Sequence, residues 1–76
     1  MKIDRTEFDA QLDALIELIR SMSAFEAKYH MLSETFFNQY SSGALEDTAD
    51  FVAWAGMYRH YIEMRQEVEG LLKHAA

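Results

Sequence analysis

The sequence predicts an all-α fold in which two long helices lie antiparallel as a hairpin and are joined by a short helical elbow. Apolar residues recur at spacings of three and four over residues 5–29 and again over residues 50–72, which is the period of an amphipathic helix. The chain contains no Pro that would interrupt either stretch. Between the two stretches lie Ser and Gly residues of the kind that begin and end helices.

The length and the composition predict one domain, residues 1–76, that associates with another chain. With 76 residues and no Cys, the chain has no room for a second core and no disulfide to stabilise the first. A chain of this size buries only about 60% of its unfolded surface, yet 50% of its residues are apolar. We therefore expect two hairpins to dimerise into a four-helix bundle.

The charge disfavours two classes of partner. The formal net charge is −6, from 13 acidic and 7 basic residues, whereas direct binding to nucleic acid or to an anionic membrane needs a basic patch. No apolar run approaches the roughly 18 residues of a membrane span, and the N-terminus lacks the apolar core of a signal peptide. We expect a cytoplasmic protein whose acidic surface aids solubility or steers a basic partner.

The first helix is expected over about residues 5–29. Asp4 or Thr6 can cap its start, and Glu7 suits the positive end of the helix dipole. At about 1.5 Å per residue the helix would extend on the order of 37 Å, so it needs a partner of similar length. Its apolar stripe is expected to consist of Phe8, Leu12, Leu15, Ile19, Met22 and Tyr29, with Ile16 and Leu18 widening it near the middle.

The elbow is expected to be a short helix over about residues 34–41. Ser33 is placed to act as its N-cap, because a serine hydroxyl can accept a hydrogen bond from a free backbone N–H of the first turn. Gly43 suits the left-handed conformation that follows a helix. Leu45 is the only large apolar residue in the next connection, and we expect it to anchor that connection.

The third helix is expected over about residues 48–73, with Asp47 or Thr48 as its cap. One row of apolar residues follows the spacing of three and four, and a second row lies beside it. The resulting band is wider than a two-position seam, which indicates more than one packing neighbour. The first row is Trp54, Met57, Tyr61, Met64, Val68 and Leu71, and the second is Phe51, Ala55, Tyr58 and Ile62.

Several residues are candidates for contact with a partner protein. Arg65 stands where the second row would continue, and an arginine beside Tyr58 and Tyr61 has the composition of an interface hot spot. The alternative is an edge arginine that pairs with Glu69 one turn later. Trp54 is assigned to the core. The candidate partner-binding residues are Phe37, Phe51, Tyr58, Tyr61 and Arg65.

No pattern in the sequence predicts an enzyme, a cofactor site or a metal site. His60 and Glu63 stand three apart, and Glu26 and His30 four apart. Neither pair has the Glu-x-x-His order and spacing that di-metal helical bundles use. The remaining carboxylates gather at predicted helix starts, where capping explains them. We expect no catalytic residue, no cofactor ligand and no metal ligand.

Residues 28–58 contain an ordered string, KY-x-M-x-SE-x-F-x3-Y-x2-G-x-L-x-D-x2-DF-x2-WA-x2-Y. Over roughly residues 25–72 the chain resembles the small α-helical antitoxin-like proteins of bacterial and archaeal toxin–antitoxin pairs. It departs from them at His30, where Gly is expected after the KY pair, although His can also adopt a positive φ.

The resemblance implies a non-catalytic protein that neutralises a cognate toxin by direct binding. The toxin would be ribonuclease-like, with a basic active-site cleft. This chain has neither a basic N-terminal ribbon nor a helix-turn-helix, so DNA binding by this chain alone is not expected. The alternative is a self-associating helical adaptor or structural subunit without a toxin partner.

Overall fold

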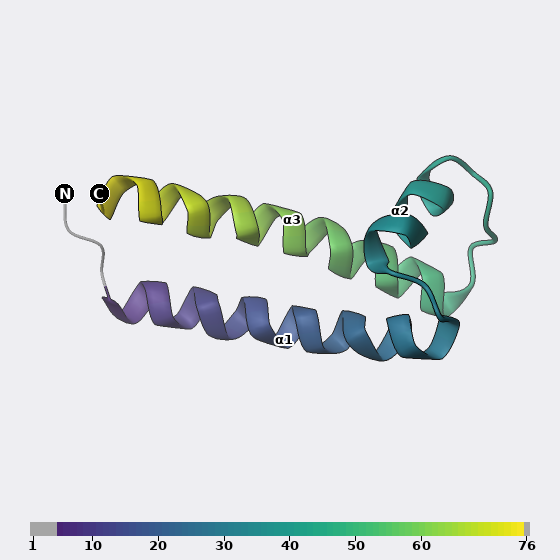
Figure 1. The fold of residues 1–76 in the computed structure, drawn as a ribbon, viewed down its shortest axis with the longest axis horizontal. Helices are drawn as coiled ribbons and strands as arrows, with labels where there is room; N and C mark the ends of the chain where they lie inside the picture. Colours follow the sequence, from purple (N-terminus) through teal and green to yellow (C-terminus); the bar gives the residue numbers. More distant parts are fainter. Residues whose placement is uncertain (1–4, 76) are drawn as a thin grey trace.

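The computed structural model describes the backbone of residues 5–75 and the side chains of residues 6–73. Its three helices are α1 (Arg5–Tyr29), α2 (Ser33–Ser41) and α3 (Ala49–Ala75), and the described residues form no strand. α1 and α3 lie side by side and run in opposite directions, with α2 at the turn between them (Figure 1). The predicted all-α hairpin with a helical elbow is thereby confirmed. The expected cap Asp4 lies outside the described residues.

The two long helices meet along rows that repeat at three and four residues. On α3 the row is the predicted one, because all six of its members are buried or half-buried. On α1 the prediction is wrong at Ile19, whose side chain is 43% exposed. Leu18, which was expected to widen the stripe, and Phe25 lie in the contact row, whereas Ile16 is exposed like Ile19. A seven-residue repeat through Leu15 and Met22 turns Ile19 away from α3. The contact row of α1 is Phe8, Gln11, Leu15, Leu18, Met22, Phe25 and Tyr29.

The centre of the core is aromatic and lies at the elbow end of the hairpin. Trp54 and Phe36 are 0% exposed, and their rings stack with centroids 3.9 Å apart and planes 5° from parallel. On the α1 side the ring of Phe25 stacks on Trp54 at 5.6 Å. Tyr29 and Phe51, at 5.1 Å from each other, close the group. We call these five residues the elbow cluster; such rings supply much of the buried apolar area of a small core.

Ser33 joins all three helices, in a role that differs from the predicted one. Its backbone N–H donates to Oε2 of Glu26 at 2.8 Å, and its hydroxyl accepts from the Trp54 indole Nε1–H at 2.8 Å. Leu32 therefore occupies the cap position of α2 and makes no side-chain cap hydrogen bond. The prediction of Ser33 as N-cap is wrong, because Ser33 is the first residue of α2, its backbone N–H donates to Glu26 of α1, and its hydroxyl accepts from Trp54.

A second polar contact joins the end of α1 to the start of α3. The carboxylate of Asp50 accepts from Lys28 Nζ at 2.7 Å and from the hydroxyl of Tyr29. Lys28 and Tyr29 as hydrogen-bond donors hold the pKa of Asp50 below its usual value, and the same carboxylate raises the pKa of both donors. The KY pair and the DF pair of the sequence thus meet at one carboxylate.

The connections on either side of α2 follow the predicted turn chemistry. His30 has φ of 53° and Gly43 has φ of 83°, so both positions that suited a left-handed residue adopt that conformation. Leu45 packs against the core cluster, as expected. Of the two candidate caps, Thr48 caps α3 through its Oγ1, which accepts from the Phe51 N–H at 3.1 Å.

Candidate protein-binding surface

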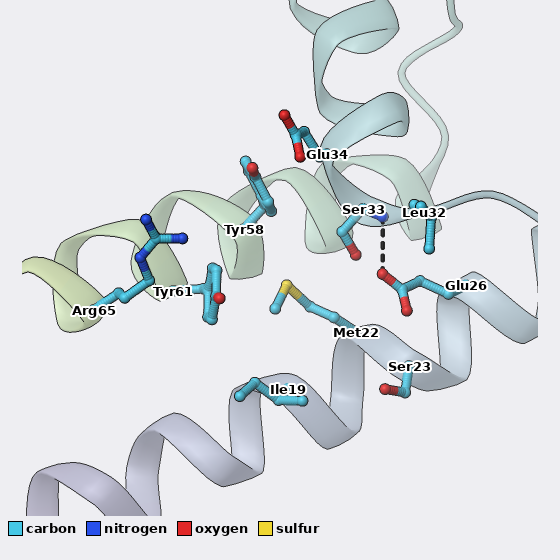
Figure 2. A pocket seen from close by; sticks show the side chains of 10 residues that line it. All are labelled: Ile19, Met22, Ser23, Glu26, Leu32, Ser33, Glu34, Tyr58, Tyr61 and Arg65. Carbon is cyan, nitrogen blue, oxygen red and sulfur yellow. Dashed lines mark hydrogen bonds between the residues drawn. The ribbon is translucent and has the colours of Figure 1, made fainter.

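Two grooves meet at Tyr58, where α2 rests on the hairpin. The first has a volume of about 320 Å³ and lies between α1, α3 and the start of α2 (Figure 2). Apolar side chains from α1 and from the link before α2 form part of its wall, and carboxylates and hydroxyls line the rest. Its lining residues are Ile19, Met22, Ser23, Glu26, Leu32, Ser33, Glu34, Tyr58, Tyr61 and Arg65.

The second groove has a volume of about 260 Å³ and is lined by residues of α2 and α3 alone. The rings of Phe37 and Tyr58 lie 5.0 Å apart. The guanidinium of Arg59 lies 5.5 Å from the centroid of the Phe37 ring, within the range of a cation–π contact. Ile62 and Glu63 complete the lining. Tyr58 is therefore the wall that the two grooves share.

The structure brings together four of the five candidate partner-binding residues. Phe37 lines the second groove, Tyr61 and Arg65 line the first, and Tyr58 lines both. The rings of Tyr58 and Tyr61 are 6.0 Å apart. Phe51 lies elsewhere, in the elbow cluster at 5.2 Å from Phe36, and lines neither groove. Its place in the structure is a packing position.

The ion pair of Arg65 with Glu69, one of the two predicted roles of this arginine, is present in the structure. The Nε of Arg65 donates to Oε1 of Glu69 at 3.2 Å, with the two side chains 55% and 56% exposed. The hydroxyl of Tyr61 and the carboxylate of Glu69 both raise the pKa of the guanidinium. Exposed ion pairs contribute little to stability. Arg65 can therefore exchange Glu69 for a partner's carboxylate at small cost.

The first groove carries two carboxylates, and they differ in availability. Glu26 uses Oε2 to accept from the Ser33 N–H (Figure 2). Glu34 is exposed in the first turn of α2. Burial, and then the nearby charge of Glu34, raise the pKa of the Tyr58 hydroxyl, which stays protonated near neutral pH. Glu34 and the tyrosine hydroxyls thus form the polar rim of the groove.

The described residues offer no group of three or more His, Asp or Glu side chains that could hold a metal ion. His60 and Glu63 are exposed on α3, and Glu26 is engaged by α2. None of the described helices combines the length and the apolar character that a membrane crossing requires.

Sequence reasoning predicted three of the ten lining residues of the first groove as partner-binding and missed the other seven, among them Ile19, Glu26 and Leu32. Ile19 was assigned to the buried stripe, and Leu32 received no role although it is 68% exposed. Glu26 interrupts the apolar stripe of α1 seven residues before Ser33. An acidic residue within an apolar stripe could have indicated this contact, because a half-buried carboxylate needs a hydrogen-bond donor from a neighbouring element.

Residues of the ordered string that carries the antitoxin resemblance form hydrogen bonds with one another. Besides the KY and DF pairs, the string's Ser33 bonds to its Trp54 at 2.8 Å. Its Tyr40 donates to Oδ1 of Asp47 at 2.6 Å. The string therefore specifies the contacts that hold α2 against α1 and α3. These contacts are a property of the fold.

No family model matches this sequence, and no curated protein or solved structure shows significant similarity to it.

Proposed function

We propose that this chain is a non-catalytic protein-binding module of the antitoxin type. In this proposal it acts in the cytoplasm as a homodimer and neutralises a basic, ribonuclease-like toxin by direct contact. The observation that carries the proposal is the convergence of three helices on the two grooves that share Tyr58.

The chemistry of the grooves supports protein binding. They combine aromatic rings, an arginine in an exposed ion pair, and the apolar side chain of Leu32, which is 68% exposed. Clustered tyrosine and arginine side chains at a concave site are typical of interface hot spots. Such a surface can take a protruding side chain from another protein.

The charge of the chain supports a basic partner. The net charge is −6, and Glu26 and Glu34 place two carboxylates at the first groove against the single guanidinium of Arg65. Complementary charge raises the rate of encounter and selects against acidic partners. The toxin as partner comes from the sequence resemblance.

The direct test is co-expression with the product of the neighbouring gene, followed by size-exclusion chromatography with light scattering. We expect an equimolar complex that survives the column, and a loss of the neighbour's ribonuclease activity when this chain is added. A neighbour that elutes separately and keeps its activity in the presence of excess chain would contradict the proposal.

The double substitution Tyr61→Ala with Arg65→Ala tests the surface itself. We expect it to weaken the complex by at least about tenfold, because hot-spot side chains contribute more than about 1 kcal/mol each. Gln66→Ala is the matched control, since Gln66 is exposed on α3 next to Arg65 and lines neither groove. Equal affinity in the two variants would remove this surface from the interface.

The alternative function is a self-associating helical adaptor without a toxin partner. The apolar side chains that remain exposed on the hairpin favour it, with Ile16 at 49% and Leu72 at 53%. A tight homodimer that does not bind the neighbouring gene product would support this alternative.

A further inference from the structure

On the side of the hairpin where α2 packs, the part of α1 and α3 that lies past α2 is not covered by another described element. Ile19 and Arg65 line the first groove from opposite helices, so they mark the same side of the hairpin as α2. Leu12 and Ile16 precede Ile19 by seven and three residues, and Leu72 follows Arg65 by seven, which keeps all of them on this side. We call Leu12, Ile16, Ile19, Arg65 and Leu72 the open face.

The open face is apolar although it is exposed. Ile16 is 49% exposed, Ile19 43% and Leu72 53%. These three, with Leu32 and Val52, are the large apolar side chains that the described residues leave exposed. Three of the five therefore lie in one band on one side of the hairpin, which is the pattern of an interaction surface.

The total surface is larger than a folded chain of this mass requires. The chain exposes 5504 Å², whereas the size scaling of folded monomers gives about 4,800 Å² for 8.8 kDa. The excess of about 700 Å² is close to the roughly 800 Å² that each partner buries in a standard protein interface. The surface of this elongated hairpin, whose extents are 45 × 21 × 17 Å, is therefore large enough to supply one interface of ordinary size.

The charge pattern of the open face favours a second copy of this chain over a basic partner. The centre of the open face is neutral, because its one charged residue, Arg65, is paired with Glu69. Asp13 and Glu17 each directly follow a residue of the face and are turned about 100° away from it, while Asp9 lies at its edge. A basic partner would require carboxylates at the centre of this face. A second acidic chain can approach it, since most of the repelling charges lie elsewhere.

We infer that the open face binds a second copy of this chain. The two open faces pack against each other about a two-fold axis, so that two α1 and two α3 helices form a four-helix bundle. The contact lies on the side of Ile16 and Leu72. Ile16 and Leu72 lie farther from α2 than Ile19 and Arg65, which mark the boundary between this contact and the first groove. Tyr58, Tyr61 and the second groove, which α2 and α3 form alone, stay accessible to a different partner.

Sedimentation and light scattering on the chain alone test this inference, so the result does not depend on the toxin proposal. We expect twice the 8.8 kDa mass of one chain over the micromolar range. Ile16→Glu should shift the equilibrium to the single chain. Val52→Glu is the matched control, because Val52 is 53% exposed but lies about 140° around α3 from Arg65, and it should leave the dimer intact.

A second experiment keeps the test valid if Ile16→Glu fails to fold. The chain contains no Cys, so any cross-link in a single-cysteine variant must join two copies. We expect Ile19→Cys to cross-link efficiently with a short bismaleimide and Val52→Cys to do so weakly, with circular dichroism confirming that both remain helical.

Each possible outcome either supports the inference or contradicts it. A dimer that Ile16→Glu dissociates and Ile19→Cys cross-links supports the inference. A wild-type chain with the mass of a single copy over the whole range overturns it, whether or not a toxin complex forms. A dimer that Val52→Glu dissociates while Ile16→Glu leaves it intact also overturns it.

Discussion

The two ends of the hairpin are built differently. At the elbow end Trp54 and Phe36 are fully buried, and every polar group that we described there has a partner on another helix or turn. At the open end Ile16 and Leu72 are about half exposed. There the buried side-chain oxygen of Gln11 has no hydrogen-bond donor among the described residues.

The difference indicates where the stability of the chain resides. Local stability follows the density of buried apolar contacts and satisfied hydrogen bonds. The elbow end has both, whereas the open end has one row of contacts between two helices. We infer that the elbow holds the single chain together and that the open end depends on an added surface.

The largest expected effect is that of Trp54→Ala. It removes the centre of the elbow cluster and should lower the free energy of unfolding by about 3–5 kcal/mol, enough to unfold a small domain. Ile16→Ala at the open end should cost less than about 1 kcal/mol, apart from any effect that varies with protein concentration. Urea unfolding followed by circular dichroism measures both. Equal losses would remove the contrast between the two ends.

A smaller effect is expected for Ser33→Ala, which leaves the Trp54 indole N–H buried without an acceptor. Such a group costs about 1–3 kcal/mol. Ser23→Ala is the control, because Ser23 lines the same groove but is exposed, and its change should stay within about 0.5 kcal/mol. If both variants unfold at the same urea concentration, the Ser33–Trp54 bond does not contribute to stability.

Asp50→Asn tests the second closure of the elbow through pH. The folded-state pKa of Asp50 is lowered from 3.8, so its carboxylate stabilises the fold above pH 3.8, and this contribution is lost as the pH falls through the folded pKa. The wild-type chain should unfold at higher urea than Asp50→Asn near pH 7, and the gap should close in acid. Asp13→Asn, at an exposed position on α1, is the matched control and should leave the urea midpoint near pH 7 unchanged. A gap for Asp50→Asn that persists in strong acid would contradict this role.

The smallest expected effect on stability is that of Arg65→Ala. Its ion pair with Glu69 is exposed on both sides, so the urea midpoint should not change measurably. The same substitution should weaken partner binding. A clear loss of stability would instead make Arg65 a structural residue of the open end.

The periodic parts of this fold were predictable from sequence, and the contacts between distant elements were not. The apolar row from Trp54 to Leu71 follows directly from its spacing, and Gly43 and Thr48 follow from turn and cap chemistry. Ile19 was misplaced because two adjacent rows on α1 are both apolar. Spacing alone does not say which of the two faces α3.

The candidate surface was predictable in composition and less so in geometry. Tyr58, Tyr61 and Arg65 share one side of a single helix, so their proximity follows from the helical period. The carboxylate of Glu26 and the backbone of Ser33 come together only because the chain reverses at His30. No local pattern encodes that contact.

The stacking of Trp54 between Phe25 and Phe36 has a practical consequence. Trp54 is the only tryptophan of the chain, so the intrinsic fluorescence reports selectively on the elbow end. Its emission should shift to longer wavelength when the elbow opens and stay unchanged when only the open end frays. A urea titration followed by both tryptophan fluorescence and circular dichroism, which reports on all three helices, can therefore show without labels whether the two ends melt together or in sequence.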